Sequence, residues 1–212
     1  MTKVKLLYII SIINIPTRCL NVKHGFIKVA AVSTKIKVAD CEYNTDCIIN
    51  KMNELANTDA RIIVFPEFCI TGSTCGDLFF QPILLSASKN ALNKIVEASV
   101  GYNAVVVVGL PFELDYKIYD CAAVIYNGKI LGIVPKVNVS NNSFSDKSRY
   151  FTPAPKDTRY VNIGGQNVSF SVDQVFKCKS ISDFTFGIEI GDDLYSVFPA
   201  SAKHATAGAT II

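Results

Sequence analysis

Residues 61–67 read Arg-Ile-Ile-Val-Phe-Pro-Glu, which predicts a buried β-strand that ends just before an acidic side chain. A short apolar run bounded by proline is typical of a strand covered on both faces of a sheet. In open α/β sheets, ligands bind outside the carboxyl ends of the strands. Glu67, flanked by apolar residues that would raise its pKa, is therefore a candidate general base, the alternative being a solvated strand end.

The segments on either side alternate between strand and helix patterns. Helical spacing of apolar residues predicts two helices, one of them with Thr45 as its N-cap. Asn127-Gly128 between two apolar runs predicts a tight hairpin. The order indicates an α/β protein with a largely covered mixed sheet. The predicted helices span residues 45–57 and 82–100, and the predicted strands span 26–33, 61–65, 105–110, 121–126, 129–134 and 184–190, with another beginning at 209.

The composition is that of a globular domain. The chain has 212 residues, 50% of them hydrophobic and 18% charged, enough for one sizeable domain or two small ones. This balance excludes disorder as the main state. The formal net charge of +3 is too small and scattered to favour nucleic acid or an anionic membrane as a partner.

The cysteines predict free thiols rather than disulfides or a metal site. Their number is odd and no two have CxxC spacing, and only His24 and His204 could complete a zinc site. Buried thiols in a reducing compartment are the simplest interpretation, so we expect a cytoplasmic protein without a metal or cofactor. The seven are Cys19, Cys41, Cys47, Cys69, Cys75, Cys121 and Cys178.

The N-terminal segment has an ambiguous pattern. Lys3 and Lys5 precede an apolar run at residues 6–15, which Pro16 ends. The run is too short to span a bilayer, and no small-residue cleavage site follows it, so a secretory signal is the weaker reading. We interpret residues 1–25 as an extension that precedes the domain proper.

Two more segments carry candidate chemistry. Lys136 follows the predicted strand at 129–134, and a lysine there could stabilise an oxyanion beside Glu67. Residues 186–194 read Phe-Gly-Ile-Glu-Ile-Gly-Asp-Asp-Leu.

Together these segments resemble the nitrilase, or carbon–nitrogen hydrolase, superfamily. Residues 65–72 and 74–79, with the Ser-Ala…Ala-Gly-Ala stretch at 200–209, are most similar to the glutamine-hydrolysing domain of glutamine-dependent NAD(+) synthetases. The resemblance implies a four-layer α-β-β-α sandwich formed by residues 26–212. It also implies a partial domain, incomplete at its C-terminal edge because the strand beginning at 209 stops at Ile212, and without the family's synthetase domain.

The resemblance implies a catalytic triad whose nucleophile is missing here. In the family a cysteine thiolate attacks the side-chain amide of glutamine; the glutamate matched by Glu67 acts as base, and the lysine matched by Lys136 stabilises the oxyanion. This chain has Gly191 where the family has that cysteine. Losing the nucleophile of a triad costs roughly 10⁶ in rate in a well-studied protease.

The segment after Lys136 also departs from the family pattern. A family tyrosine that contacts glutamine aligns near Asn142, and a second family glutamate falls on Lys147 or, with one gap, on Asp146. Cys69 and Cys75 are poor substitutes for the nucleophile, because acyl transfer needs the sulfur close to the oxyanion donors. Asp192 and Asp193 are acidic but poor nucleophiles toward an amide.

Three hypotheses follow. The first is a truncated, catalytically inactive glutaminase domain, since function is lost at three separate places. The second is an active carbon–nitrogen hydrolase whose given sequence is faulty or partial, since Glu67 and Lys136 are retained. The third is a non-enzymatic assembly partner that forms homo- or hetero-oligomers through its sandwich faces.

Overall fold

The computed structural model describes residues 8–13, 26–139, 147–181 and 183–212. Its larger sheet is mixed and has the strand order β2-β3-β4-β5-β6-β8-β7. β2, β3 and β4 run parallel, and β5 and β6 continue from β4 as antiparallel neighbours. The strands are β2 (Lys28–Ala31), β3 (Ala60–Val64), β4 (Val105–Leu114), β5 (Lys117–Tyr126), β6 (Lys129–Pro135), β7 (Arg159–Ile163) and β8 (Gln166–Phe170).

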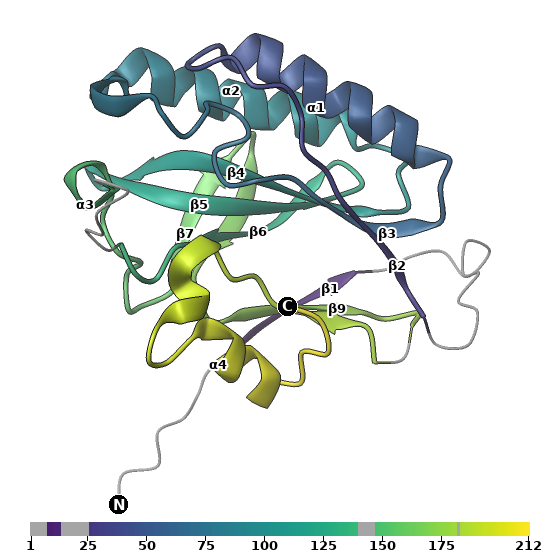
Figure 1. Cartoon of the computed structure of the whole chain (residues 1–212). Helices are drawn as coiled ribbons and strands as arrows, with labels where there is room; N and C mark the ends of the chain where they lie inside the picture. The colour runs from purple at the N-terminus through teal and green to yellow at the C-terminus, as the bar shows by residue number, and fades with distance from the viewer. Residues whose placement is uncertain (1–7, 14–25, 140–146, 182) are drawn as a thin grey trace, which may run out of the picture.

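A smaller sheet packs against the larger one. Its order is β1-β9-β10, with β1 parallel and β10 antiparallel to β9. The strands are β1 (Ile9–Ile13), β9 (Gln174–Cys178) and β10 (Thr185–Phe186). Figure 1 shows helices α1 and α2 above the larger sheet and the short helix α4 below the smaller sheet, so the predicted four-layer sandwich is confirmed. The helices are α1 (Cys41–Ala56), α2 (Pro82–Ala98), α3 (Lys147–Tyr150) and α4 (Ala200–Thr206), with 3₁₀ turns η2 (Gly76–Phe80) and η3 (Gly191–Tyr195).

The larger sheet is buried on both faces because each face has its own core. Successive side chains of a strand point to opposite faces. In β4, Val106 and Val108 join the core under α1 and α2, whereas Val105 and Val107 join the core between the two sheets. The continuous apolar run that predicted a covered strand is explained by this arrangement.

Helix α1 begins four residues earlier than predicted, and Thr45 is not its N-cap. Asp40 caps the helix instead, because its carboxylate accepts a hydrogen bond from the Tyr43 amide at 3.0 Å. The Thr45 hydroxyl donates to the Cys41 carbonyl at 2.6 Å, one turn back inside the helix. Both residue types favour N-caps, so sequence alone did not distinguish them.

The Asn127-Gly128 hairpin is confirmed, and both turn residues have the positive φ angles, 46° and 75°, that a type I′ turn requires.

The strand predicted at 184–190 is much shorter than expected, since only Thr185 and Phe186 form β10. Beyond β10, the described residues contribute an isolated parallel bridge from Phe186 to Ile211 instead of the strand expected from 209. The prediction that the domain is incomplete at this edge stays a prediction.

Part of the segment interpreted as an extension belongs to the folded structure. Ile9–Ile13 forms β1, and Ile13 is 1% exposed in the core between the sheets. Cys19 and His24, which also lie in that segment, fall outside the described residues.

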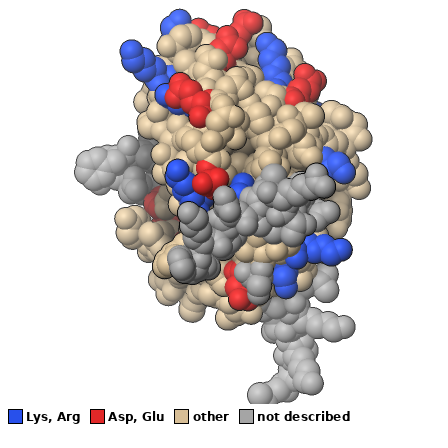
Figure 2. Space-filling view, turned by 90° about the vertical axis from the view of Figure 1, so that its right-hand side faces the viewer, with Lys and Arg blue, Asp and Glu red and all other residues tan. Residues whose placement is uncertain are grey.

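The surface carries charges of both signs. Figure 2 shows Lys and Arg side chains interspersed with Asp and Glu over one face of the molecule. In the part of the chain that the structure describes, no helix is long and apolar enough to cross a membrane.

Candidate active site

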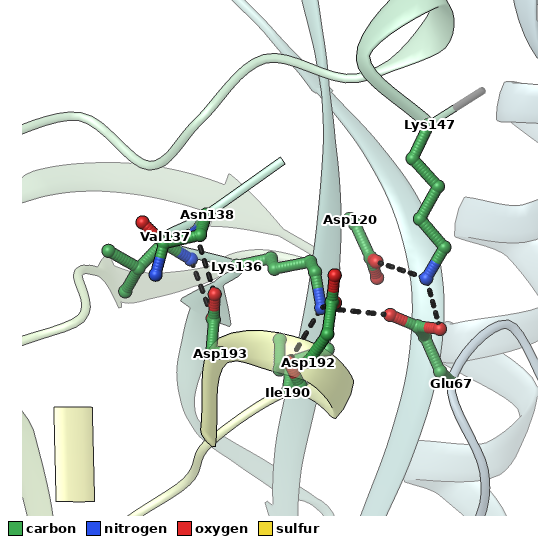
Figure 3. A network of polar contacts seen from close by, with 9 residues as sticks. All are labelled: Glu67, Asp120, Lys136, Val137, Asn138, Lys147, Ile190, Asp192 and Asp193. Carbon is green, nitrogen blue, oxygen red and sulfur yellow. Dashed lines mark hydrogen bonds and ion pairs between the residues drawn. The ribbon is translucent and has the colours of Figure 1, made fainter. Parts of the chain in front are cut away.

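Glu67 and Lys136 lie at the same edge of the larger sheet. Glu67 follows β3 and Lys136 follows β6, and these strands run in the same direction, so their carboxyl ends meet at one edge. The Lys136 Nζ is 3.4 Å from Glu67 Oε1 (Figure 3). The two side chains were expected to meet at this edge, and the structure places them in contact.

The loop that carries Glu67 passes very close to the neighbouring strand β4. A Cβ on Gly109 would lie 2.6 Å from both the Pro66 carbonyl oxygen and the Phe68 amide nitrogen. Backbone at that distance cannot yield to a side chain. Glycine at 109 therefore allows the chain to turn after β3 and present Glu67 over the sheet edge.

Position 191 lies between the two retained groups. Gly191 opens η3, with a φ of 53°, and a Cβ built on it would lie 3.1 Å from Lys136 Nζ and 3.3 Å from Glu67 Oε1. A side chain at 191 would thus contact both the acid and the lysine. This is where a nucleophile served by that pair would have to stand, and glycine supplies no reacting atom.

The Lys136 ammonium is fully engaged by protein acceptors. It contacts Asp192 Oδ1 at 2.5 Å, the Ile190 carbonyl at 2.6 Å and Glu67 Oε1 at 3.4 Å. A lysine ammonium has three N–H groups, so none is left for another acceptor. Burial lowers the pKa of Lys136, but the hydrogen bond to Asp192 and the charge of Glu67 outweigh burial and raise it. The Lys136 side chain therefore stays positively charged and is held by these three contacts.

Glu67 is held from its other side by a second lysine. Lys147, at the start of α3, donates to Glu67 Oε2 and lies 3.8 Å from Asp120 Oδ2 in β5 (Figure 3). Burial alone would raise the pKa of Glu67, but interaction with Asp120 and the charges of Lys147 and Lys136 lower it. A carboxylate with a lowered pKa is a weaker general base.

Asp120 is the buried acid of this network, with 1% of its surface exposed. Burial, and then the neighbouring Glu67 carboxylate, raise its pKa well above the ordinary value. Two carboxyl groups this close cannot both ionise at low cost, so the proton resides on Asp120 while Glu67 stays charged.

Asp193 anchors η3 beneath the loop after β6. Its carboxylate accepts hydrogen bonds from the Val137 amide at 2.8 Å and the Asn138 amide at 2.7 Å (Figure 3). This contact fixes Gly191 relative to Lys136 across a long sequence separation. Asp192 and Asp193 thus have ionic and structural partners, and neither is poised as a nucleophile.

The nearby cysteines do not replace the missing thiol. Cys69 is buried, its Sγ lies 3.5 Å from the Gly109 carbonyl, and burial raises its pKa to about 12. Cys75 is directed to the Thr71 carbonyl at 3.2 Å, and burial raises its pKa as well. Both stay protonated thiols. All six cysteines of the described segments are free, and five of them are buried.

A cavity of about 250 Å³ opens beside Glu67 and Gly191, between strands of the larger sheet and residues 187–191, which follow β10. Its walls are mostly apolar, and Glu189, another acidic residue on its lining, is held by the Ser201 amide at 3.1 Å. In the described segments, no group of three or more His, Cys, Asp and Glu side chains could hold a metal ion.

Three positions of this site were predicted from the sequence, Lys147 was named only as the position of a family glutamate, and Asp120 was missed. Glu67, Lys136 and position 191 come together as expected, whereas Asn142 lies outside the described residues. Asp120 was missed because the strand was predicted to begin at residue 121, whereas β5 begins at Lys117. An acidic residue directly beside a buried apolar run was the available signal.

A carbon-nitrogen hydrolase family model matches residues 28–211. The chain belongs to the carbon–nitrogen hydrolase family. The glutamine-dependent NAD(+) synthetase of Mycobacterium tuberculosis is 32% identical over 190 residues, which cover 90% of this chain and 28% of that protein. That of Aquifex aeolicus is 33% identical over 135 residues, covering 64% and 23%.

Solved structures agree with the carbon–nitrogen hydrolase fold. A glutamine-dependent NAD(+) synthetase from Cytophaga hutchinsonii superposes with a TM-score of 0.68 at 23% identity, covering 76% of this chain and 27% of that chain. An amidase from Nesterenkonia sp. gives 0.54 at 18% identity, covering 71% and 56%. This carbon–nitrogen hydrolase chain spans about 28% of the length of the Mycobacterium tuberculosis relative.

Proposed function

We propose that this chain is a carbon–nitrogen hydrolase domain that no longer hydrolyses glutamine. The observation that carries the proposal is the geometry at position 191. A Cβ there would lie 3.1 Å from Lys136 Nζ and 3.3 Å from Glu67 Oε1, yet the residue is glycine. Without a side chain, no covalent acyl-enzyme can form at the point where acid and lysine converge.

The ion pairs around position 191 support the same proposal. An oxyanion donor must offer a free N–H to the developing charge. All three donors of Lys136 already have acceptors, and Glu67 is paired with Lys147 as well. Glu67 and Lys136 thus pair with groups of the protein itself, which leaves neither an available base nor an available oxyanion donor for a substrate.

Mass spectrometry of the intact protein tests the covalent step directly. The chain is incubated with glutamine, quenched in acid and weighed beside a matched sample without glutamine. We expect identical masses, because residue 191 offers no atom for acylation. A stable mass increase equal to a glutamyl group, lost in Glu67→Gln, would contradict the proposal.

An active glutaminase is the second candidate, since the relatives are named as glutamine-dependent NAD(+) synthetases and the contact between Glu67 and Lys136 persists. In that reading the chain would supply ammonia to a synthetase domain, and codon 191 would specify cysteine. Sequencing the transcript through codon 191 and past codon 212 separates the two. A cysteine codon would revive the active enzyme, and a confirmed glycine codon would remove it.

A third candidate is an assembly partner. Side chains just after η3 are strongly exposed although apolar, with Val197 at 88% and Phe198 at 84%. Contiguous exposed apolar residues mark interaction sites on soluble proteins. Light scattering of the purified chain tests this candidate, which requires a defined oligomer or a defined complex with a full-length relative; a monomer that forms neither would remove it.

A further inference from the structure

Strand β1 lies outside residues 28–211, the part of the chain that the family model matches. It is nevertheless an ordered part of the smaller sheet, and Figure 1 shows it beside β9. Five residues pair in a parallel register, from Ile9 opposite Gln174 to Ile13 opposite Cys178. The fold therefore includes a strand that the family model does not account for.

Hydrogen bonds secure both ends of this strand. The Ile9 amide donates to the Asp173 carbonyl at 3.0 Å, and the Lys179 amide donates to the Ile13 carbonyl at 2.8 Å. In the middle, the Ser11 hydroxyl donates to the Leu131 carbonyl of β6 at 3.1 Å. The strand is thus joined to β9 along its length and to the larger sheet at its centre.

The two faces of β1 are strongly different. Ile13 is 1% exposed and belongs to the core between the sheets, whereas Ile10 and Ile12 are 57% and 65% exposed. A one-residue slip would exchange these faces. Burial of Ile13 and the inward hydroxyl of Ser11 therefore fix a single register.

We propose that the edge of β9 is a strand-accepting site and that Ile9–Ile13 occupies it in cis as a structural strand of the domain. The site takes an extended peptide with a small polar residue at the centre and an apolar residue two positions later, since those side chains face Leu131 and the inter-sheet core. A vacated β9 would present unpaired amides and carbonyls beside apolar surface, as in other strand-addition sites.

Two full-length variants of adjacent residues provide the test. Ile13→Asp places a charge in the core between the sheets, and Ile12→Asp is the matched control on the exposed face. Amide hydrogen exchange is followed at Lys179, whose N–H bonds to Ile13. We expect protection at Lys179 to fall by a factor of about ten or more in Ile13→Asp and to stay near wild type in Ile12→Asp. Equal protection in the two variants would overturn the proposal.

Adding the strand back in trans tests the accepting site itself. A peptide of residues 8–13 is added to the Ile13→Asp chain, and the same peptide carrying aspartate at its last position is the control. We expect only the wild-type peptide to restore protection at Lys179. If Ile13→Asp unfolds the whole chain, Ile13→Ala takes its place, and failure of the peptide to protect Lys179 there would refute the site.

Discussion

At the residue scale, the site is defined by a side chain that is absent and by two lysines that neutralise what remains. Lys136 and Lys147 hold Glu67 from opposite sides, and Gly191 leaves the space between acid and lysine empty of a reacting atom. The charged groups of this network pair with one another inside the protein, and Asp192 makes the shortest contact of Lys136. A side chain restored at position 191 would therefore leave Glu67 and Lys136 paired as they are now.

We therefore predict that Gly191→Cys alone does not release glutamate from glutamine. The new thiol would stand beside a base whose pKa is lowered and a lysine without a free donor. The substitution also places a side chain at a φ of 53°, at a cost of about 1–2 kcal/mol. The measurement is a coupled glutamate assay on the purified variant.

Gly191→Ala is the matched control for that variant, since it adds the same Cβ without sulfur. Both variants should show the circular dichroism of the wild-type chain. Glutamate release by Gly191→Cys, with none by Gly191→Ala, would show that the network does not disable the site.

The buried carboxyl group makes stability depend on pH. The folded-state pKa of Asp120 is raised above the unfolded value of about 3.9, so the native state binds more protons and loses stability as pH rises above about 4. Asp120→Asn removes that loss while keeping the shape. We predict that unfolding free energy of the variant, relative to wild type, increases as pH rises, measured by urea denaturation. A constant difference between pH 4 and 8 would contradict this.

At the scale of elements, helix α1 depends on its cap. Asp40→Ala removes the carboxylate that accepts from the Tyr43 amide, and we expect a loss of about 1 kcal/mol in unfolding free energy. Asp46→Ala, an exposed aspartate within the same helix, should change it by less than about 0.5 kcal/mol. Equal effects of the two substitutions in urea denaturation would argue against the cap.

Elements with a strong local signal were predicted from the sequence. The apolar runs at β3 and β4 and the Asn127-Gly128 turn were recognised because each carries its own pattern. The hairpin joining β4 to β5 was not, because its turn residues Asp115 and Tyr116 adopt positive φ angles of 51° and 59° without glycine. The conformation of such a turn depends on how the two flanking strands pair, and the sequence of the turn does not reveal that pairing.

At the scale of the whole molecule, the larger sheet holds two cores together. Phe176 of β9 is fully buried between the sheets, so Phe176→Ala should cost about 3–5 kcal/mol of unfolding free energy. Tyr160→Ala, at a side chain 63% exposed on β7, is the control and should cost far less. A small loss for Phe176→Ala in urea denaturation would mean that the smaller sheet contributes little to stability.

Part of the candidate site could be predicted from the sequence and part could not. Glu67, Lys136 and position 191 could be brought together beforehand, because strand ends and resemblance both place them. The contacts of Lys147 and Asp120 could not, since they depend on how α3 packs over the sheet edge. The role of β1 was hidden for the same reason, as its apolar run has no partner visible in the sequence.

The most direct test of the central claim is glutamate release by the wild-type chain itself. Purified protein is incubated with glutamine, and glutamate is measured against the Glu67→Gln variant, which removes the base without changing the backbone. The account predicts that both samples match the enzyme-free background. Turnover by the wild-type chain that disappears in Glu67→Gln would contradict it.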